Sequence, residues 1–168
     1  PGMKGGEEVG SGDHYLKPET AAGLIGLLYV AKQEGLSISM GDMSTSNGSD
    51  PGTDDFHHKG HGHMGKRSGL DIDFRYIGSD GTPFQGLITD EKFNSSKNQL
   101  FYDLAFRFGF DPKNTYQGKG GGLEGVKKMG GHDNHGHLGM DKKFKNITII
   151  GHADEGYICN DENEVITE

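Results

Sequence analysis

Three of the chain's nine histidines fall within the short stretch HDNHGHLGM, residues 132–140. Histidine is a common metal ligand and the side chain whose pKa lies nearest to neutral pH. In an extended strand, residues two apart point to the same face, so His135 and His137 can enter one cleft together. The cluster therefore predicts a metal site or an acid–base site, and a solvated histidine-rich loop is the simpler alternative.

A second segment, HHKGHGHMGKRSGLDIDF, can supply the partners that a metal bound at His137 needs. Hydrolytic zinc sites use three protein ligands and keep one position for a water, whose pKa the metal lowers toward ~7. One imidazole and one carboxylate from this segment complete such a set. In residues 70–76, apolar side chains alternate with Asp71, Asp73 and Arg75. Alternation alone favours solvent exposure for these carboxylates, whereas a ligand must line a cleft.

The properties of the whole chain restrict its function. Its 168 residues predict a single domain over residues 14–153, preceded by a flexible segment (1–13) and followed by an acidic tail (154–168). The net charge of −8 argues against nucleic-acid binding. No apolar run approaches the ~20 residues of a membrane span, and the first residues show no signal peptide. Cys159 is the single cysteine, which excludes an internal disulfide.

Hydrophobic periodicity predicts the elements that position these residues. Helices are expected at 17–35 and 94–110, and strands at 36–40 and 70–76. Residues 135–140 and 144–150 are expected to form a hairpin, and the glycine-dense segment 118–125 a loop. This pattern predicts an α+β fold with a small antiparallel sheet of about four strands.

Several segments resemble, in order along the chain, the LAS metallopeptidases, which include lysostaphin, D-alanyl-D-alanine peptidases and hedgehog domains. They are most similar to the penicillin-insensitive murein endopeptidases. The segments are YLKPETAAGLIGLL, GDMS, GHGHMGKRSGLDIDFRY, LAFRFGFD and HDNHGH. The resemblance runs from about Tyr15 to Ile150. It implies helices packed on one face of the sheet, a zinc cleft on the other, and a bound Zn²⁺ ion.

The resemblance also implies a role for each of four residues. Asp73 is the carboxylate ligand and His137 is an imidazole ligand of the zinc ion. His135 stabilises the oxyanion, and His132 takes the position of the general base. An imidazole can accept a proton from a reacting water and later deliver it to the leaving amine.

The first imidazole ligand departs from the family pattern. The family's histidine aligns with Lys66, and a protonated lysine has no lone pair for a metal. His63, ten residues before Asp73, is the predicted ligand in its place, with His61 as the alternative.

The implied function is a zinc-dependent peptidoglycan peptidase that cleaves a peptide bond in bacterial cell-wall cross-links or stems. The resemblance places it in the periplasm or outside the cell, as the catalytic domain of a cell-wall-degrading effector or lysin. If it is an effector, a cognate inhibitor protein is an expected partner. The alternative is a non-catalytic, zinc-stabilised binding module of the hedgehog kind, and the acidic charge disfavours a metal-dependent nuclease.

Overall fold

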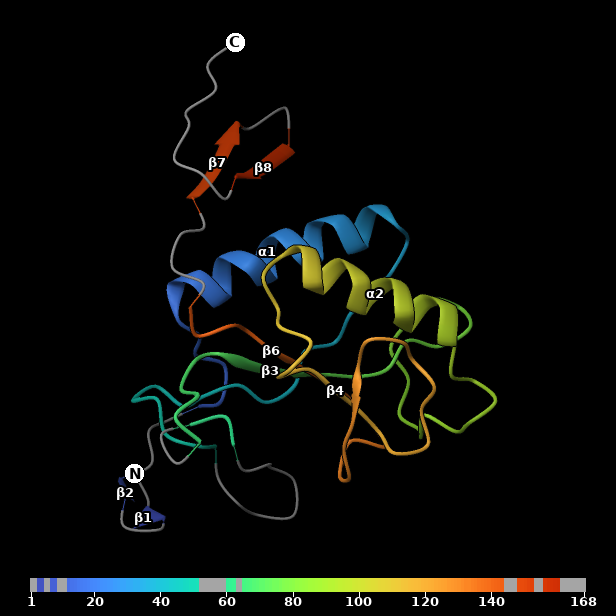
Figure 1. The fold of residues 1–168 in the computed structure, drawn as a ribbon, viewed down its shortest axis with the longest axis horizontal. Coiled ribbons are helices and arrows are strands. Elements are labelled where there is room, and N and C mark those ends of the chain that lie inside the picture. The colour runs from blue at the N-terminus through green and yellow to red at the C-terminus, as the bar shows by residue number, and fades with distance from the viewer. Residues whose placement is uncertain are drawn as a thin grey trace.

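The structure is a computed structural model that describes residues 12–51, 60–62 and 65–143, and the backbone of four short strands outside these ranges. The elements are β1 (Met3–Lys4), β2 (Glu7–Glu8), α1 (Pro18–Gln33), β3 (Asp71–Phe74), α2 (Ser95–Arg107), β4 (Tyr116–Gln117), β5 (Lys127–Lys128), β6 (Gly136–Gly139), β7 (Thr148–His152) and β8 (Gly156–Asn160). Both helices lie on the same side of β3 and β6 (Figure 1). The architecture is a small α+β fold, as predicted.

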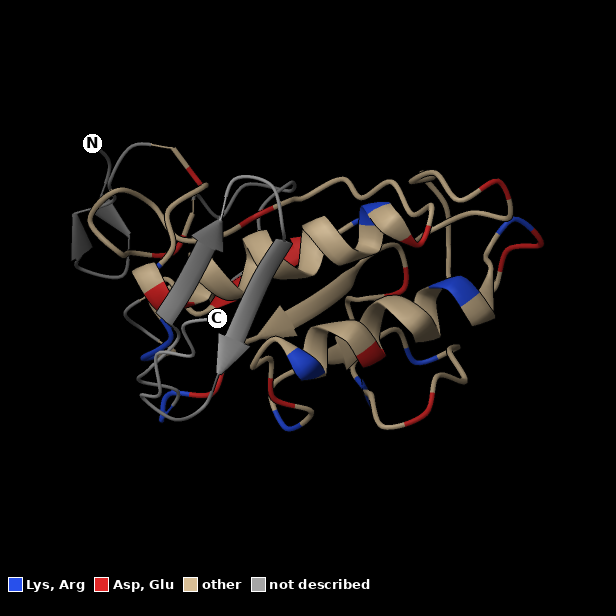
Figure 2. Ribbon diagram, turned by 90° about the horizontal axis from the view of Figure 1, so that it is seen from above, with Lys and Arg blue, Asp and Glu red and all other residues tan. Residues whose placement is uncertain are grey.

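The two predicted helices are confirmed. Pro18 opens α1 at a position where its missing N–H costs no hydrogen bond. Asn94 caps α2, because its side-chain oxygen accepts a hydrogen bond of 2.9 Å from Lys97 N. The helices run close together over the sheet (Figure 2). Gly26 permits this approach, since a Cβ there would lie 2.6 Å from the Phe108 ring.

The main sheet has the strand order β3-β6-β4-β5 and is mixed, which corrects the prediction of an antiparallel sheet. The pairs β3–β6 and β4–β6 are antiparallel, but β4 and β5 are parallel. The buried Gln117 side chain explains the difference. Its amide donates to Leu123 O (2.7 Å) and Val126 O (2.8 Å) and accepts from Leu123 N (3.0 Å). The glycine-dense segment is thereby held in a wide loop, which returns β5 in the direction of β4.

Two other predictions of local structure are wrong. Residues 36–40 alternate in burial as a strand would, but Met40 makes only an isolated bridge to Phe74. The predicted hairpin between 135–140 and 144–150 does not form. Because β6 pairs with β3 on one side and β4 on the other, it has no edge left for β7, which pairs with β8 instead.

The strands β3 and β6 present an apolar face to the helices. Ile72, Phe74 and Leu138 are buried in the core, and the Phe74 ring packs against Phe101 and Tyr102 of α2 with centroid distances of 4.8 and 5.4 Å. Since side chains alternate across a strand, Asp71, Asp73 and His137 lie on the opposite face. The strand that anchors the core thus also carries the candidate site.

Candidate metal centre

Asp73 and His137 meet because their strands pair in this register. Asp73 is the direct cross-strand partner of His137 in the antiparallel β3–β6 ladder, and His137 Nδ1 lies 2.9 Å from Asp73 Oδ1. Gly136 sets how closely β6 approaches the core. A Cβ at Gly136 would lie 2.4 Å from both Phe74 Cζ and Tyr102 Oη, so the residue between the two histidines has no room for a side chain.

His61 reaches the same place from the irregular segment before β3. The Asp50 carboxylate accepts hydrogen bonds from Gly60 N (2.9 Å) and Gly62 N (2.6 Å), and so holds the turn around His61. The Ser44 hydroxyl donates to His61 O and accepts from Gly69 N, the latter over 2.6 Å. Ser44 thus links the His61 turn to the chain just before β3.

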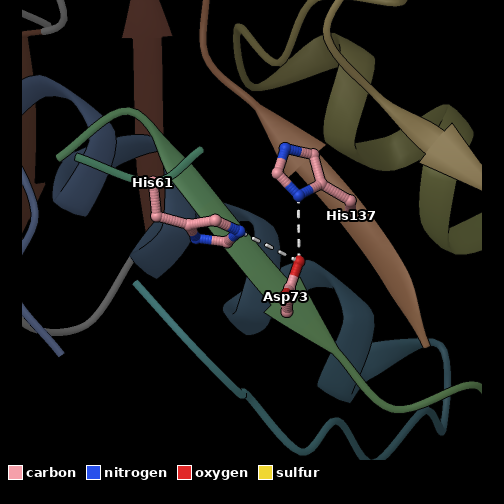
Figure 3. Close-up of side chains that lie close together, drawn as sticks. All are labelled: His61, Asp73 and His137. Atoms are coloured by element: carbon pink, nitrogen blue, oxygen red, sulfur yellow. Dashed lines mark hydrogen bonds and ion pairs between the residues drawn. The ribbon is translucent and has the colours of Figure 1, made fainter. Parts of the chain in front are cut away.

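His61, Asp73 and His137 form a group that can hold a metal ion, with ligand atoms all within 4.8 Å of one another. His61 Nε2 lies 3.5 Å from Asp73 Oδ1, the same oxygen that faces His137 (Figure 3). The residues are 2 %, 4 % and 6 % exposed, respectively. Two imidazoles and one carboxylate are a ligand set typical of a zinc site with an open position.

The surroundings of His137 fit a bound cation. Its Nε2 lies 3.1 Å from Asp71 Oδ1, while Nδ1 faces Asp73. A carboxylate accepts but does not donate, so the Nε2 hydrogen points at Asp71. A cation that displaces the proton from Nδ1 would then bind to the lone pair of that nitrogen. Arg67 fixes Asp71 in turn, with its Nε 2.8 and 2.7 Å from the two carboxylate oxygens. Such a carboxylate–imidazole pair orients metal-binding histidines in many proteins.

The pKa values of His137 and Asp73 reflect these contacts. Burial alone would lower the pKa of His137, but the hydrogen bonds and charges of Asp71 and Asp73 raise it to about 9. Burial would raise the pKa of Asp73, yet hydrogen bonds from His137 and His61 and their charges hold that pKa well below its usual range. Both nitrogens of His137 face a carboxylate, and the raised pKa means that the ring carries two protons at neutral pH when no cation is present.

His135 and His132 lie beside this group and form a second one with Asp73, again with ligand atoms within 4.8 Å of one another. His135 Nε2 is 3.7 Å from Asp73 Oδ2, and the rings of His132 and His135 lie 4.8 Å apart between centroids. The Tyr76 hydroxyl donates to His132 O (2.8 Å) and accepts from Gly118 N (3.0 Å). Tyr76 thereby anchors the segment that carries His132 to the core.

A cavity of about 410 Å³ opens onto the two histidine groups. Its wall includes side chains from the metal-binding group and from its neighbours, namely His61, His137, Asp71, Arg67, Tyr116 and His132. Gly60, Gly65, Gly130 and Gly131 also line it. A molecule in this cavity can reach His61, His137 and His132 together.

Four of the predicted site residues lie close together, as expected: Asp73, His132, His135 and His137. Asp71 and Asp73 are both buried, so the alternative that alternation alone favours, carboxylates facing solvent, is wrong. His63, the predicted first ligand, lies outside the described residues.

The alternative first ligand, His61, is the imidazole that completes the group. Lys66, which the resemblance aligns with the histidine of the metallopeptidases, is exposed and adopts a positive φ of 55°. Lys66 therefore does not replace the ligand within the cluster.

Asp71 was considered from the sequence as an alternative carboxylate partner of His63 on the face of Asp73, but its contact with His137 was not predicted. Two further contributors were missed. Arg67 carried a weaker signal, four residues before its partner Asp71. Tyr116 gave none, although it pairs with His137 across β4–β6 and its ring lies 5.1 Å from the imidazole between centroids.

Comparisons of this chain with protein-family models, with curated proteins and with solved structures find no match. Within the described residues, no helix is both long and apolar enough to cross a membrane.

Proposed function

We propose that this protein is a zinc-dependent peptidase that hydrolyses a peptide bond in bacterial peptidoglycan. The observation that carries the proposal is the buried His61–Asp73–His137 group at the wall of a 410 Å³ cavity that His132 also lines. The ordered resemblance to murein endopeptidases supplies the substrate class. The same resemblance supports a secreted setting, as an effector or lysin domain, with an inhibitor protein as partner in the effector case.

Zinc held by His61, Asp73 and His137 would supply a Lewis acid that activates water and polarises the scissile carbonyl. His137 is prepared for this by Asp71, which holds the Nε2 hydrogen and leaves Nδ1 to the ion. The low pKa of Asp73 keeps its carboxylate ionised at neutral pH. The negative charge needed to bind a dication is thus already present.

His132 is placed to move the proton. Its ring lines the cavity and lies 5.6 Å from the His137 ring between centroids. Its Nδ1 is 3.3 Å from Gly130 O, an acceptor, so Nδ1 carries hydrogen and the neutral ring offers Nε2 as the base. His132 accepts the proton of the attacking water and returns it to the amine that leaves.

His135 stabilises the negative charge that develops on the carbonyl oxygen. It is buried beside Asp73, and its Nδ1 lies 2.7 Å from Asn134 Oδ1, which fixes the ring. An N–H on His135 Nε2, the nitrogen that lies 3.7 Å from Asp73 Oδ2, would stabilise the carbonyl oxygen without reorganisation of the site.

The test is digestion of purified sacculi by the zinc-loaded protein, with released muropeptides identified by mass spectrometry. We expect cleavage products whose masses reveal the bond, lost on chelation and in His137→Ala. His14→Ala is the matched control, since His14 is an exposed histidine outside the cluster and its loss should leave cleavage intact. Zinc binding without cleavage of any sacculi would defeat the peptidase proposal and favour the non-catalytic binding module.

A further inference from the structure

The Asp73 carboxylate presents its two oxygens to two sets of imidazoles. Oδ1 lies 2.9 Å from His137 Nδ1 and 3.5 Å from His61 Nε2, whereas Oδ2 lies 3.7 Å from His135 Nε2. Ligand atoms of Asp73, His132 and His135 also lie within 4.8 Å of one another. We propose that the cluster binds two divalent cations, with Asp73 as the bridge and with His132 and His135 as the ligands of the second ion.

Hydrogen bonds orient both histidines for this role. The His135 Nδ1 faces an amide oxygen, Asn134 Oδ1, at 2.7 Å, and the His132 Nδ1 faces a backbone carbonyl, Gly130 O, at 3.3 Å. Because both partners only accept, each neutral ring carries its hydrogen on Nδ1 and its lone pair on Nε2. For His135 this lone pair faces Asp73 Oδ2, and a cation between the two atoms satisfies both.

The chemistry of the ligands indicates which ions bind and in what order. Imidazole-rich sets with one carboxylate suit Zn²⁺, Co²⁺, Ni²⁺ or Cu²⁺ better than Mg²⁺ or Ca²⁺. The first ion takes the His61 and His137 side, where Asp71 adds negative charge next to His137. The second site is weaker, because two dications repel each other and His132 is half-buried rather than buried. Since His132 lines the cavity, the second ion can enter from solvent.

Two-ion binding has a consequence that rests on the proposed function. The second ion occupies His132 and His135, the two residues that the peptidase needs for proton transfer and for oxyanion stabilisation. Excess metal therefore inhibits cleavage at the concentration that fills the second site. Metal binding itself requires no activity, so the two proposals can fail separately.

The experiment is a Co²⁺ titration of the metal-free full chain, followed by visible absorption and electron paramagnetic resonance. We expect two equivalents, the second at least tenfold weaker than the first. Ions that share a carboxylate lie about 3.5–4 Å apart, so the second equivalent should attenuate the resonance signal of the first. His132→Ala and His135→Ala should each lose the second equivalent and keep the first, while His61→Ala should weaken the first.

Two control variants test whether other histidines of the chain bind the second ion. His14→Ala, and a double variant at His57 and His58, should retain both equivalents. Binding of a single equivalent up to millimolar Co²⁺ would overturn the proposal. So would a second equivalent that survives His132→Ala and His135→Ala, or one that leaves the first signal unchanged. Two coupled equivalents in a protein that cleaves no sacculi would sustain this inference while the proposed function fails.

Discussion

The candidate metal-binding group, His61, Asp73 and His137, is built by two different kinds of structure. Asp73 and His137 come from adjacent strands, where the ladder register places them opposite each other. His61 comes from an irregular segment, where the Ser44 and Asp50 side chains hold the backbone. A ladder defines side-chain positions through a regular repeat, whereas a loop needs a separate contact for each residue. The strand half should therefore be the more robust part of the site.

The largest effect is expected at the strand half. Asp73→Asn keeps the shape of the side chain but removes the charge that both imidazoles face. Zinc affinity should therefore fall on the order of a thousandfold. This loss corresponds to roughly a third of the ~10–16 kcal/mol by which a structural site binds zinc. Competition with a chromophoric chelator measures this loss. Asp111→Asn is the control, because the Asp111 carboxylate bonds Lys113 N and Asn114 Nδ2 and is not part of the metal-binding group. An affinity within tenfold of the native value would remove Asp73 from the ligand set.

The loop half is tested by comparing two histidines that stand two residues apart. His61→Ala should lower zinc affinity on the order of a few hundredfold, since it removes one of three protein ligands. His63→Ala should change it by less than about threefold. The same chelator competition reads out both variants. The reverse result would make His63 the ligand, as the sequence analysis predicts.

The strand half should also be visible in the pH dependence of the metal-free protein. The pKa of His137 is raised in the folded state to about 9 from an ordinary 6.5. Protonated His137 therefore stabilises the folded state by roughly 3 kcal/mol. This contribution to the free energy of unfolding is complete below pH 6.5 and is lost as the pH rises through 9. Urea unfolding in the presence of a chelator, from pH 6 to 10, measures it. A flat profile over that range would contradict the double carboxylate contact.

Asp71 supports the strand half without joining the ligand set. In Asp71→Asn, the amide can still meet the Nε2 hydrogen through its oxygen, but the charge that strengthens the imidazole as a ligand is lost. Zinc affinity should fall by about 10–100-fold, and the pKa of His137, followed by NMR in the metal-free protein, should drop toward 6.5. A lower affinity with an unchanged pKa would mean that Asp71 acts only by packing.

The smallest effect is expected from the support of the loop. Ser44→Ala removes the hydrogen bonds to His61 O and from Gly69 N, so the His61 backbone is held less firmly and zinc affinity should fall about tenfold. Ser68→Ala is the matched control, because the Ser68 hydroxyl bonds Gly48 O rather than the His61 turn. Equal losses in the two variants would show that Ser44 has no specific part in placing His61.

The contrast between regular strands and an irregular segment also explains which parts of the fold and site could be predicted from the sequence. The helices and β3 were predicted because apolar periodicity and capping residues are local signals. Strand alternation showed that His135 and His137 share a face, but Asp73 and His137 were named as ligands only through the resemblance to the metallopeptidases. The position of His61 depends on contacts with Ser44 and Asp50, both more than ten residues away, for which no periodicity exists. The parallel β4–β5 pair depends in the same way on the buried Gln117 amide.

Gly136 and the two histidines beside it, His135 and His137, serve different purposes. The position of the glycine is dictated by the Phe74 and Tyr102 rings on the far side of the strand, not by any cation. A variant that lost both histidines would still need this glycine for β6 to pack against the core. The glycine therefore belongs to the fold, whereas the imidazoles on either side belong to the candidate metal site.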